Sequence, residues 1–212
     1  MIELALGSGP LDVLCIGAHS DDIEIGCGGA VLRLLAERPG SHVRWVVLSA
    51  SPEREDEARA SAADFLVDAG SADIEVSTFR ESFFPAAWTE IKDHLNDLRT
   101  RADPDIVLCH HRHDEHQDHR TVAQLAWNTW RNHLIAEYEI PKYEGDLGLP
   151  NVFVALAPDV AARKVELIMK HFGTQHDKYW FRPETFAGLM AVRGVEAGAA
   201  AAEAFHVRKL VL

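Results

Sequence analysis

Two short apolar runs in this chain each end in a cluster of histidine and carboxylate side chains. Residues 11–16 are followed by a histidine and two adjacent aspartates, and residues 105–109 by an eleven-residue stretch with five histidines. Apolar runs of this length predict buried strands. Because parallel sheets bind ligands at the carboxyl ends of their strands, two such clusters predict one shared site in an α/β fold.

The first cluster consists of His19, Asp21 and Asp22, beside a glycine-rich stretch at 26–29. The two carboxylates would repel each other unless a positive charge lay between them, and a divalent metal supplies that charge. The alternative is a solvated acidic loop that caps the next helix. On this cluster alone, both interpretations stay open.

The second cluster favours the metal site over the solvated loop, because it places further metal-ligand side chains at another strand end. A helix from Asp118 onward would direct His116 and His119 to the same side, so that one can bind metal and the other face a substrate. The alternative is a polar loop with solvated histidines. The agreement of two strand ends favours the metal site.

Apolar runs and helical periodicities alternate along the chain. We expect strands over residues 11–16, 42–49, 73–78, 105–109, 151–157 and 205–211. We expect helices over residues 30–37, 51–69, 88–101, 121–135, 159–171 and 183–195, with Asp159 as a cap. Residues 137–150 lack periodicity and predict a lid or specificity loop. The pattern predicts one domain over residues 1–212, a Rossmann-like three-layer α/β sandwich with a mostly parallel sheet.

The formal net charge of −12 and the pI near 5.4 argue against a nucleic-acid or anionic-membrane partner and favour a small-molecule substrate. Cys15, Cys27 and Cys109 lack zinc-ribbon spacing, so we expect small buried residues in a reducing compartment. With no leader pattern and no apolar stretch long enough to span a bilayer, we expect a cytoplasmic protein. The sequence leaves open whether it forms a homo-oligomer.

These motifs resemble those of the PIG-L/LmbE-like zinc-dependent deacetylases, which remove acetyl groups from N-acetylated amino sugars. The family's first motif, Ala-His-Pro-Asp-Asp before an acidic residue and glycines, stands here as residues 18–29, with Ser20 in place of proline. Its second motif, His-x-Asp-His, stands as residues 116–119. Supporting matches lie at Arg54-x-x-Glu57, 164–171 with 174–175, and 203–205. A further departure is Ala201, where relatives often carry an aromatic residue.

The resemblance implies that His19, Asp22 and His119 hold the metal, a two-histidine, one-carboxylate set that leaves a position free for chemistry. The expected metal is Zn²⁺, and Fe²⁺ or another divalent metal also suits these ligands. The resemblance further implies that Asp21 is the general base that takes a proton from the attacking water.

The resemblance also assigns His116, held in orientation by Asp118, to stabilise the tetrahedral oxyanion as an imidazolium. Arg54 is expected to contact the substrate, and the alternative is an ion pair with Glu57 one turn along the same helix. Relatives use the loop that corresponds to residues 79–85 to wall the substrate pocket.

The expected function is therefore hydrolysis of the acetyl group of an N-acetylated amino sugar or glycoconjugate. One alternative is a metal-dependent amidase that acts on another acylated amine. Another is a non-hydrolytic Rossmann-type nucleotide-binding protein, but Gly26, Gly28 and Gly29 do not have G-x-G-x-x-G spacing and are expected to form a tight turn. A receiver-like phosphoacceptor would leave the histidines around His116 unexplained.

Overall fold

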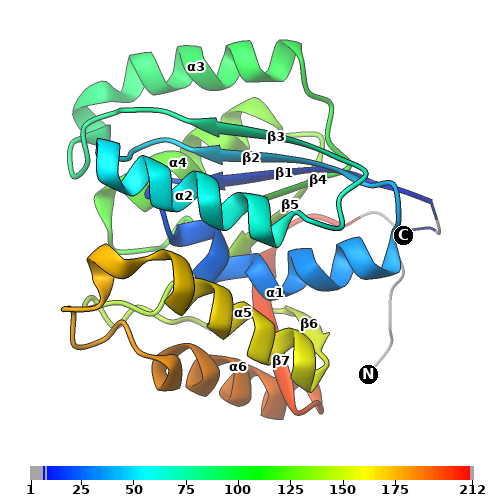
Figure 1. Ribbon diagram of the computed structural model, residues 1–212. Coiled ribbons are helices and arrows are strands. Elements are labelled where there is room, and N and C mark those ends of the chain that lie inside the picture. The colour runs from blue at the N-terminus through cyan, green and yellow to red at the C-terminus, as the bar shows by residue number, and fades with distance from the viewer. Residues whose placement is uncertain (1–6, 8, 211–212) are drawn as a thin grey trace.

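A seven-stranded sheet lies at the centre of the molecule (Figure 1). The computed structural model describes residue 7 and residues 9–210. The strands are β1 (Asp12–Gly17), β2 (His42–Val47), β3 (Ser71–Val76), β4 (Ile106–His110), β5 (Leu134–Tyr138), β6 (Val152–Leu156) and β7 (Ala201–Val207). They are ordered β3-β2-β1-β4-β5-β7-β6. Strands β1 to β5 pair in parallel, and β7 is antiparallel to both of its neighbours. The predicted mostly parallel α/β sheet is confirmed.

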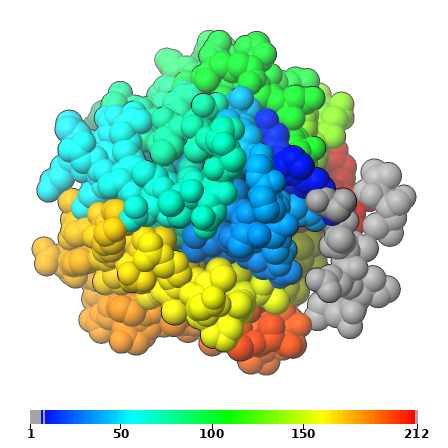
Figure 2. All heavy atoms as spheres, turned by 45° about the vertical axis from the view of Figure 1, so that its right-hand side comes forward, coloured from blue at the N-terminus to red at the C-terminus, as the bar shows by residue number. Residues whose placement is uncertain are grey.

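Helices cover both faces of this sheet. Within the described residues they are α1 (Asp22–Glu37), α2 (Pro52–Phe65), α3 (Trp88–Thr100), α4 (Gln117–Thr129), α5 (Pro158–His171) and α6 (Pro183–Ala197). The side chains of β1 alternate between the two layers: Val13 and Cys15 pack with α1, α2 and α5, whereas Leu14 and Ile16 pack with α3 and α4. Figure 2 shows α1 in blue, α2 in cyan and α5 in yellow, side by side on one face. The predicted three-layer sandwich is confirmed.

The sheet order reverses between β1 and β4, since β2 and β3 extend the sheet on one side and β5 on the other. Such a switch point leaves a crevice at the carboxyl ends of the two central strands. The segment 18–22 leaves β1 at this edge, and β4 ends there in His110. The topology therefore brings the two predicted motifs together.

Helix α1 begins at Asp22 rather than at residue 30, and its glycines lie inside the helix instead of forming a tight turn. A Cβ atom added to Gly28 would lie 2.6 Å from Phe65 Cε1, and one added to Gly26 would collide with the ring of Tyr138. Real side chains do not approach so closely. The glycines therefore allow α1 to pack tightly against α2 and β5 directly beneath the site, which corrects the expected role.

The structure also corrects the region between α4 and α5. The helix predicted over 121–135 ends at Thr129, and residues 134–138 form β5. The alternation of apolar and polar residues that marks a strand is obscured here, because Glu137 is fully buried in β5, where it contacts His111 and Arg112. Helix α5 is preceded by Ala157 as N-cap, so the predicted Asp159 cap is wrong. The last strand covers 201–207, and residue 211 of its predicted range lies outside the described residues.

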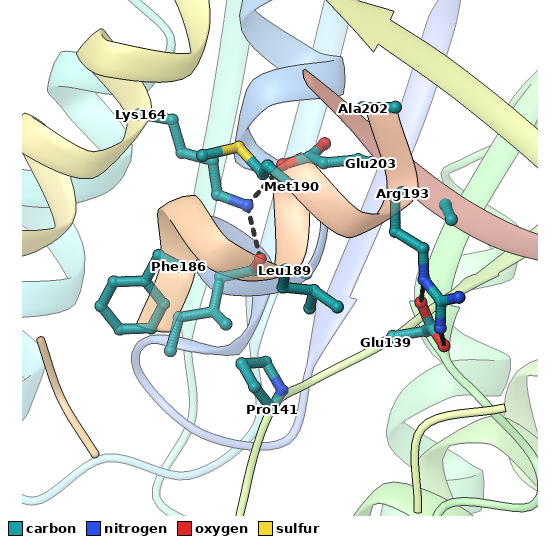
Figure 3. A pocket seen from close by; sticks show the side chains of 12 residues that line it. Glu139, Pro141, Lys164, Phe186, Leu189, Met190, Arg193, Ala202 and Glu203 are labelled. Carbon is teal, nitrogen blue, oxygen red and sulfur yellow. Dashed lines mark hydrogen bonds and ion pairs between the residues drawn. The ribbon is translucent and has the colours of Figure 1, made fainter. Parts of the chain in front are cut away.

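A buried ion pair joins α5 and β7 to the middle of α1 (Figure 3). Lys164 Nζ lies 2.5 Å from Glu203 Oε1 and donates to the carbonyl of Ile25 at 2.6 Å. Glu203 also accepts hydrogen bonds from the N–H groups of Gly29 and Ala30, at 2.9 and 2.6 Å. The supporting sequence matches at 164–171 and 203–205 thus contact each other and fix α1, the helix that begins at the first motif.

Two further expectations concern the cysteines and membrane-spanning helices. Cys15, Cys27 and Cys109 are free and buried, as predicted. Among the helices of the described residues, none combines the length and the apolar character needed to cross a bilayer.

Candidate functional site

His19 and Asp22 lie at the turn from β1 into α1, where both side chains are buried. Asp22 Oδ2 accepts a hydrogen bond from the His19 backbone N–H at 2.6 Å and lies 3.4 Å from Nδ1 of the same residue. The other ring nitrogen of His19, Nε2, lies 3.1 Å from Asp118 Oδ2. His19 therefore has one nitrogen against each of two carboxylates.

His119 reaches the same point from the first turn of α4. Its Nε2 lies 3.2 Å from His19 Nδ1 and 3.5 Å from Asp22 Oδ1. Ligand atoms about 2.0 to 2.2 Å from a tetrahedral zinc ion stand roughly 3.3 Å apart, and the two ring nitrogens have this separation. Asp22 faces His19 with Oδ2 and His119 with Oδ1. The opposite ring nitrogen of His119, Nδ1, lies 2.9 Å from Asp114 Oδ2.

The charges around this point favour a cation. Burial opposes protonation of His19, yet Asp22 and Asp118 raise its pKa to about 10. Burial would raise the pKa of Asp22, but His119, His110 and His19 hold it well below its usual value. Burial, with the neighbouring His110, lowers the pKa of His119 to about 4. The carboxylates thus stabilise positive charge beside His19, whereas the lowered pKa of His119 favours a neutral ring, the form that binds metals.

Asp21 points to a different partner from its neighbour Asp22. Its Oδ1 accepts a hydrogen bond of 2.8 Å from Arg54, in the first turn of α2. Burial raises the pKa of Asp21, while the Arg54 guanidinium acts in the opposite direction. The alternative pairing of Arg54 with Glu57 is not observed, because Glu57 accepts hydrogen bonds from the N–H and hydroxyl of Thr174 at 2.8 and 2.7 Å.

His116 is the N-cap of α4, and its Nδ1 accepts a hydrogen bond of 3.2 Å from the Asp118 N–H. The Asp118 carboxylate does not orient this ring, which corrects the sequence expectation. It accepts from the N–H groups of Ser82 and Phe84, at 2.6 and 3.1 Å, and faces His19. Asp118 is the second residue of α4, and both of its carboxylate oxygens are already engaged by these three partners.

Burial and the neighbouring His19 lower the pKa of His116, which works against the expected imidazolium. The ring nonetheless lies at the site, with its centroid 4.5 Å from that of His119 and 5.0 Å from that of His19. The segment that follows β3 also reaches the site, since the Phe84 ring lies 6.1 Å from the His19 ring. The loop expected over 79–85 thus borders the first motif.

Sequence reasoning assigned no role to His110 or Asp114. Two overlapping groups have the spacing to hold a metal ion: His19 with His116 and His119, and Asp22 with His110 and His119. His110 ends β4 and stacks on the His119 ring at 3.8 Å, but its Nε2 accepts a hydrogen bond of 2.9 Å from the Ala18 N–H. That nitrogen is therefore occupied. Its place as the first of five histidines after an apolar run was the available sequence signal.

Comparison with known proteins gives consistent results. The model of the PIG-L family, described as GlcNAc-PI de-N-acetylase, matches residues 14–130. The uncharacterized deacetylase YaiS of Escherichia coli K12 is 28% identical over 174 residues, which cover 75% of this chain and 89% of YaiS.

Solved structures share the fold at lower identity. The N,N'-diacetylchitobiose deacetylase of Pyrococcus horikoshii is 23% identical, with a TM-score of 0.71, over 93% of this chain and 83% of that one. GalB, the 4-carboxy-2-hydroxymuconate hydratase of Pseudomonas putida KT2440, is 20% identical, with a TM-score of 0.75, over 95% and 97% of the two chains. Since one fold carries two reactions, the fold alone does not assign the activity. The family model nevertheless spans more than half of the sequence, and the chain belongs to the PIG-L family.

Proposed function

We propose that this protein is a metal-dependent deacetylase that hydrolyses the acetamide of an N-acetylated amino sugar or its conjugate, releasing acetate and a free amine. Membership of a family described as GlcNAc-PI de-N-acetylase supports this reaction, as does the likeness to a chitobiose deacetylase. The observation that carries the proposal is the convergence of His19 Nδ1, His119 Nε2 and the Asp22 carboxylate, with separations of 3.2 to 3.5 Å.

In this proposal His19, Asp22 and His119 hold a divalent metal, Zn²⁺ or Fe²⁺. Each histidine has a carboxylate on the ring nitrogen that faces away, Asp118 for His19 and Asp114 for His119. Such partners fix the tautomer and the orientation of metal-binding histidines. The bound metal would supply Lewis-acid polarisation of the acetamide carbonyl and would lower the pKa of water.

The remaining polar groups of the site have separate roles in the proposal. Asp21 accepts the proton of the attacking water, and the Arg54 guanidinium favours the ionised carboxylate against the burial that raises its pKa. Arg54 Nε is buried and has no hydrogen-bond partner among the described residues, so one donor of the guanidinium beside Asp21 is unused. We therefore retain Arg54 as a substrate-binding residue.

His116 is proposed as the hydrogen-bond donor to the oxyanion, and the proton that Asp21 takes from water passes on to the departing amine. Because its Nδ1 accepts from the Asp118 N–H, the ring carries its proton on Nε2. A neutral ring with Nε2–H can donate to an oxyanion, so the role does not require the imidazolium expected from sequence.

The test is acetate release from N-acetylglucosamine, diacetylchitobiose and nucleotide-linked N-acetylated amino sugars, measured together with metal content. We expect acetate from at least one of these substrates, loss of activity on chelation, and recovery when Zn²⁺ or Fe²⁺ is added. Release of a different acid from other acylated amines would favour the amidase alternative. Tightly bound nucleotide without metal, or hydration of an unsaturated dicarboxylate by the metal-loaded protein, would overturn the proposal.

A further inference from the structure

The segment 139–150 follows β5 and buries a lysine against the second motif. The Lys142 side chain is 9% exposed. Its Nζ lies 2.9 Å from Asp114 Oδ2 and 2.6 and 2.7 Å from the two carboxylate oxygens of Asp146. A lysine so enclosed loses hydration and rotamer freedom, so a specific pairing must compensate that loss.

Asp114, the partner of Lys142, also contacts both site histidines of this motif. Its Oδ2 lies 2.9 Å from His119 Nδ1, and its Oδ1 accepts a hydrogen bond of 2.8 Å from the His116 N–H. Lys142 and His119 therefore share a single oxygen of a carboxylate that is 3% exposed. With contacts on both oxygens, this carboxylate has one orientation, and the His119 ring follows it.

The segment that carries Lys142 is itself anchored at several points. Asp146 Oδ2 accepts a hydrogen bond of 2.6 Å from the Glu115 N–H, which lies in the second motif. On the opposite side, Arg193 of α6 forms a buried ion pair with Glu139 at 2.6 Å and donates to the Gly148 carbonyl at 3.1 Å. Figure 3 shows the Glu139–Arg193 pair in place. The position of Lys142 is thus set by the scaffold.

We propose that Lys142 is a positioning residue for the metal site: through Asp114 it fixes the His119 ring, and residues 139–150 thereby set the affinity for the metal. The inference rests on the proposed function, in which His119 is a ligand. The direction in which metal affinity changes when Lys142 is replaced distinguishes two possible effects. A lysine cation near a metal ion repels it, so loss of the charge alone would tighten metal binding, whereas loss of positioning weakens it.

The test measures the Zn²⁺ dissociation constant of the full chain by competition with a chromogenic chelator. We expect Lys142→Met to weaken binding by about 10- to 100-fold, the usual effect of removing an outer-shell partner. Lys142→Arg keeps a cation at Asp114 and should restore most of the affinity. The matched control is Lys92→Met, because Lys92 Nζ also bonds to α4, at Thr129 Oγ1, 2.8 Å away and at the far end of that helix.

A double-mutant cycle separates positioning from general damage to the fold. If Lys142 acts through Asp114, Lys142→Met in an Asp114→Asn background should change the affinity by less than about twofold. Additive effects would overturn the inference, as would unchanged or tighter Zn²⁺ binding by Lys142→Met. If Lys142→Met fails to fold, the Zn²⁺ affinity of Asp146→Asn is measured instead. Weaker binding is expected, and unchanged binding would contradict the inference.

The same measurements distinguish this inference from the proposed function. If wild type and Lys92→Met bind no divalent metal, the proposed function fails and the inference with it. If both bind Zn²⁺ and Lys142→Met binds it equally well, only the role of Lys142 is wrong.

Discussion

Arg54 donates to Asp21 at 2.8 Å, so the guanidinium of one supporting motif touches the first metal motif. Both side chains are largely buried, at 14% and 8% exposure. Glu57 of the same Arg-x-x-Glu motif faces the other way and holds Thr174, in the connection between α5 and α6. The two charged residues of this motif therefore serve different parts of the molecule, one at the site and one in the scaffold.

We predict that Arg54→Ala lowers kcat/KM by about 10- to 100-fold, because a hydrogen bond to a charged group contributes roughly 1.5 to 3 kcal/mol. The melting temperature should also fall, because the substitution leaves the buried Asp21 carboxylate without its cation. Arg59→Ala is the control, since Arg59 lies on the same helix and, within the part of the chain that the structure describes, bonds only to Glu55 and a backbone carbonyl. Unchanged kinetics with a lowered melting temperature would show that Arg54 is structural.

The Lys164–Glu203 pair predicts a large effect on stability. Lys164→Met should lower the free energy of unfolding by about 3 to 5 kcal/mol, because it leaves the buried Glu203 carboxylate without its cation. Urea denaturation measures this change. Lys170→Met, which breaks an exposed pair with Asp64, should cost less than about 1 kcal/mol. Equal losses in the two variants would contradict the importance of burial.

Apart from β5, the sequence was sufficient to predict the mostly parallel sheet and the meeting of the two motifs, because apolar runs that end in polar clusters mark the strand ends of a parallel sheet. It could not place the start of α1. Gly26 and Gly28 are turn residues by propensity, and their helical role depends on Tyr138 and Phe65, which are distant in sequence. Tertiary packing overrode local preference at these positions.

The side-chain contacts of the site were harder to predict than its location. The motif pattern gives the spacing of Asp118 and His116 but not the direction of the carboxylate, whose partners at positions 19, 82 and 84 are distant in sequence. The partner of Asp114 lies 28 residues away at Lys142, in a segment without periodicity. Such long-range ion pairs leave no local pattern, so Asp114 could be given no role from sequence, and the segment was predicted only as a lid or specificity loop.

Acid stability should depend on Glu137. Burial would raise the pKa of this carboxyl, but His111 and Arg112 lower it from 4.5 to about 2. Because the unfolded chain binds the proton more readily, the stabilising contribution is complete above pH 4.5 and is lost as the pH falls towards 2. The difference corresponds to roughly 3 kcal/mol. Urea unfolding between pH 3 and 7 should show this loss in wild type and a flatter dependence in Glu137→Gln; identical slopes would contradict the assignment.

The adjacent carboxylates Asp21 and Asp22 should separate by function. Asp22 faces the two histidines and Asp21 faces Arg54, so we expect Asp22→Asn to lower metal content and Asp21→Asn to preserve it. An amide at position 21 cannot accept the proton of water, so kcat should fall by about 10² to 10⁴ with the metal in place. His116→Ala, which removes a donor rather than a proposed ligand, should also retain metal while losing activity. Turnover by Asp21→Asn close to that of wild type, at equal metal content, would refute the assignment of Asp21 as the base.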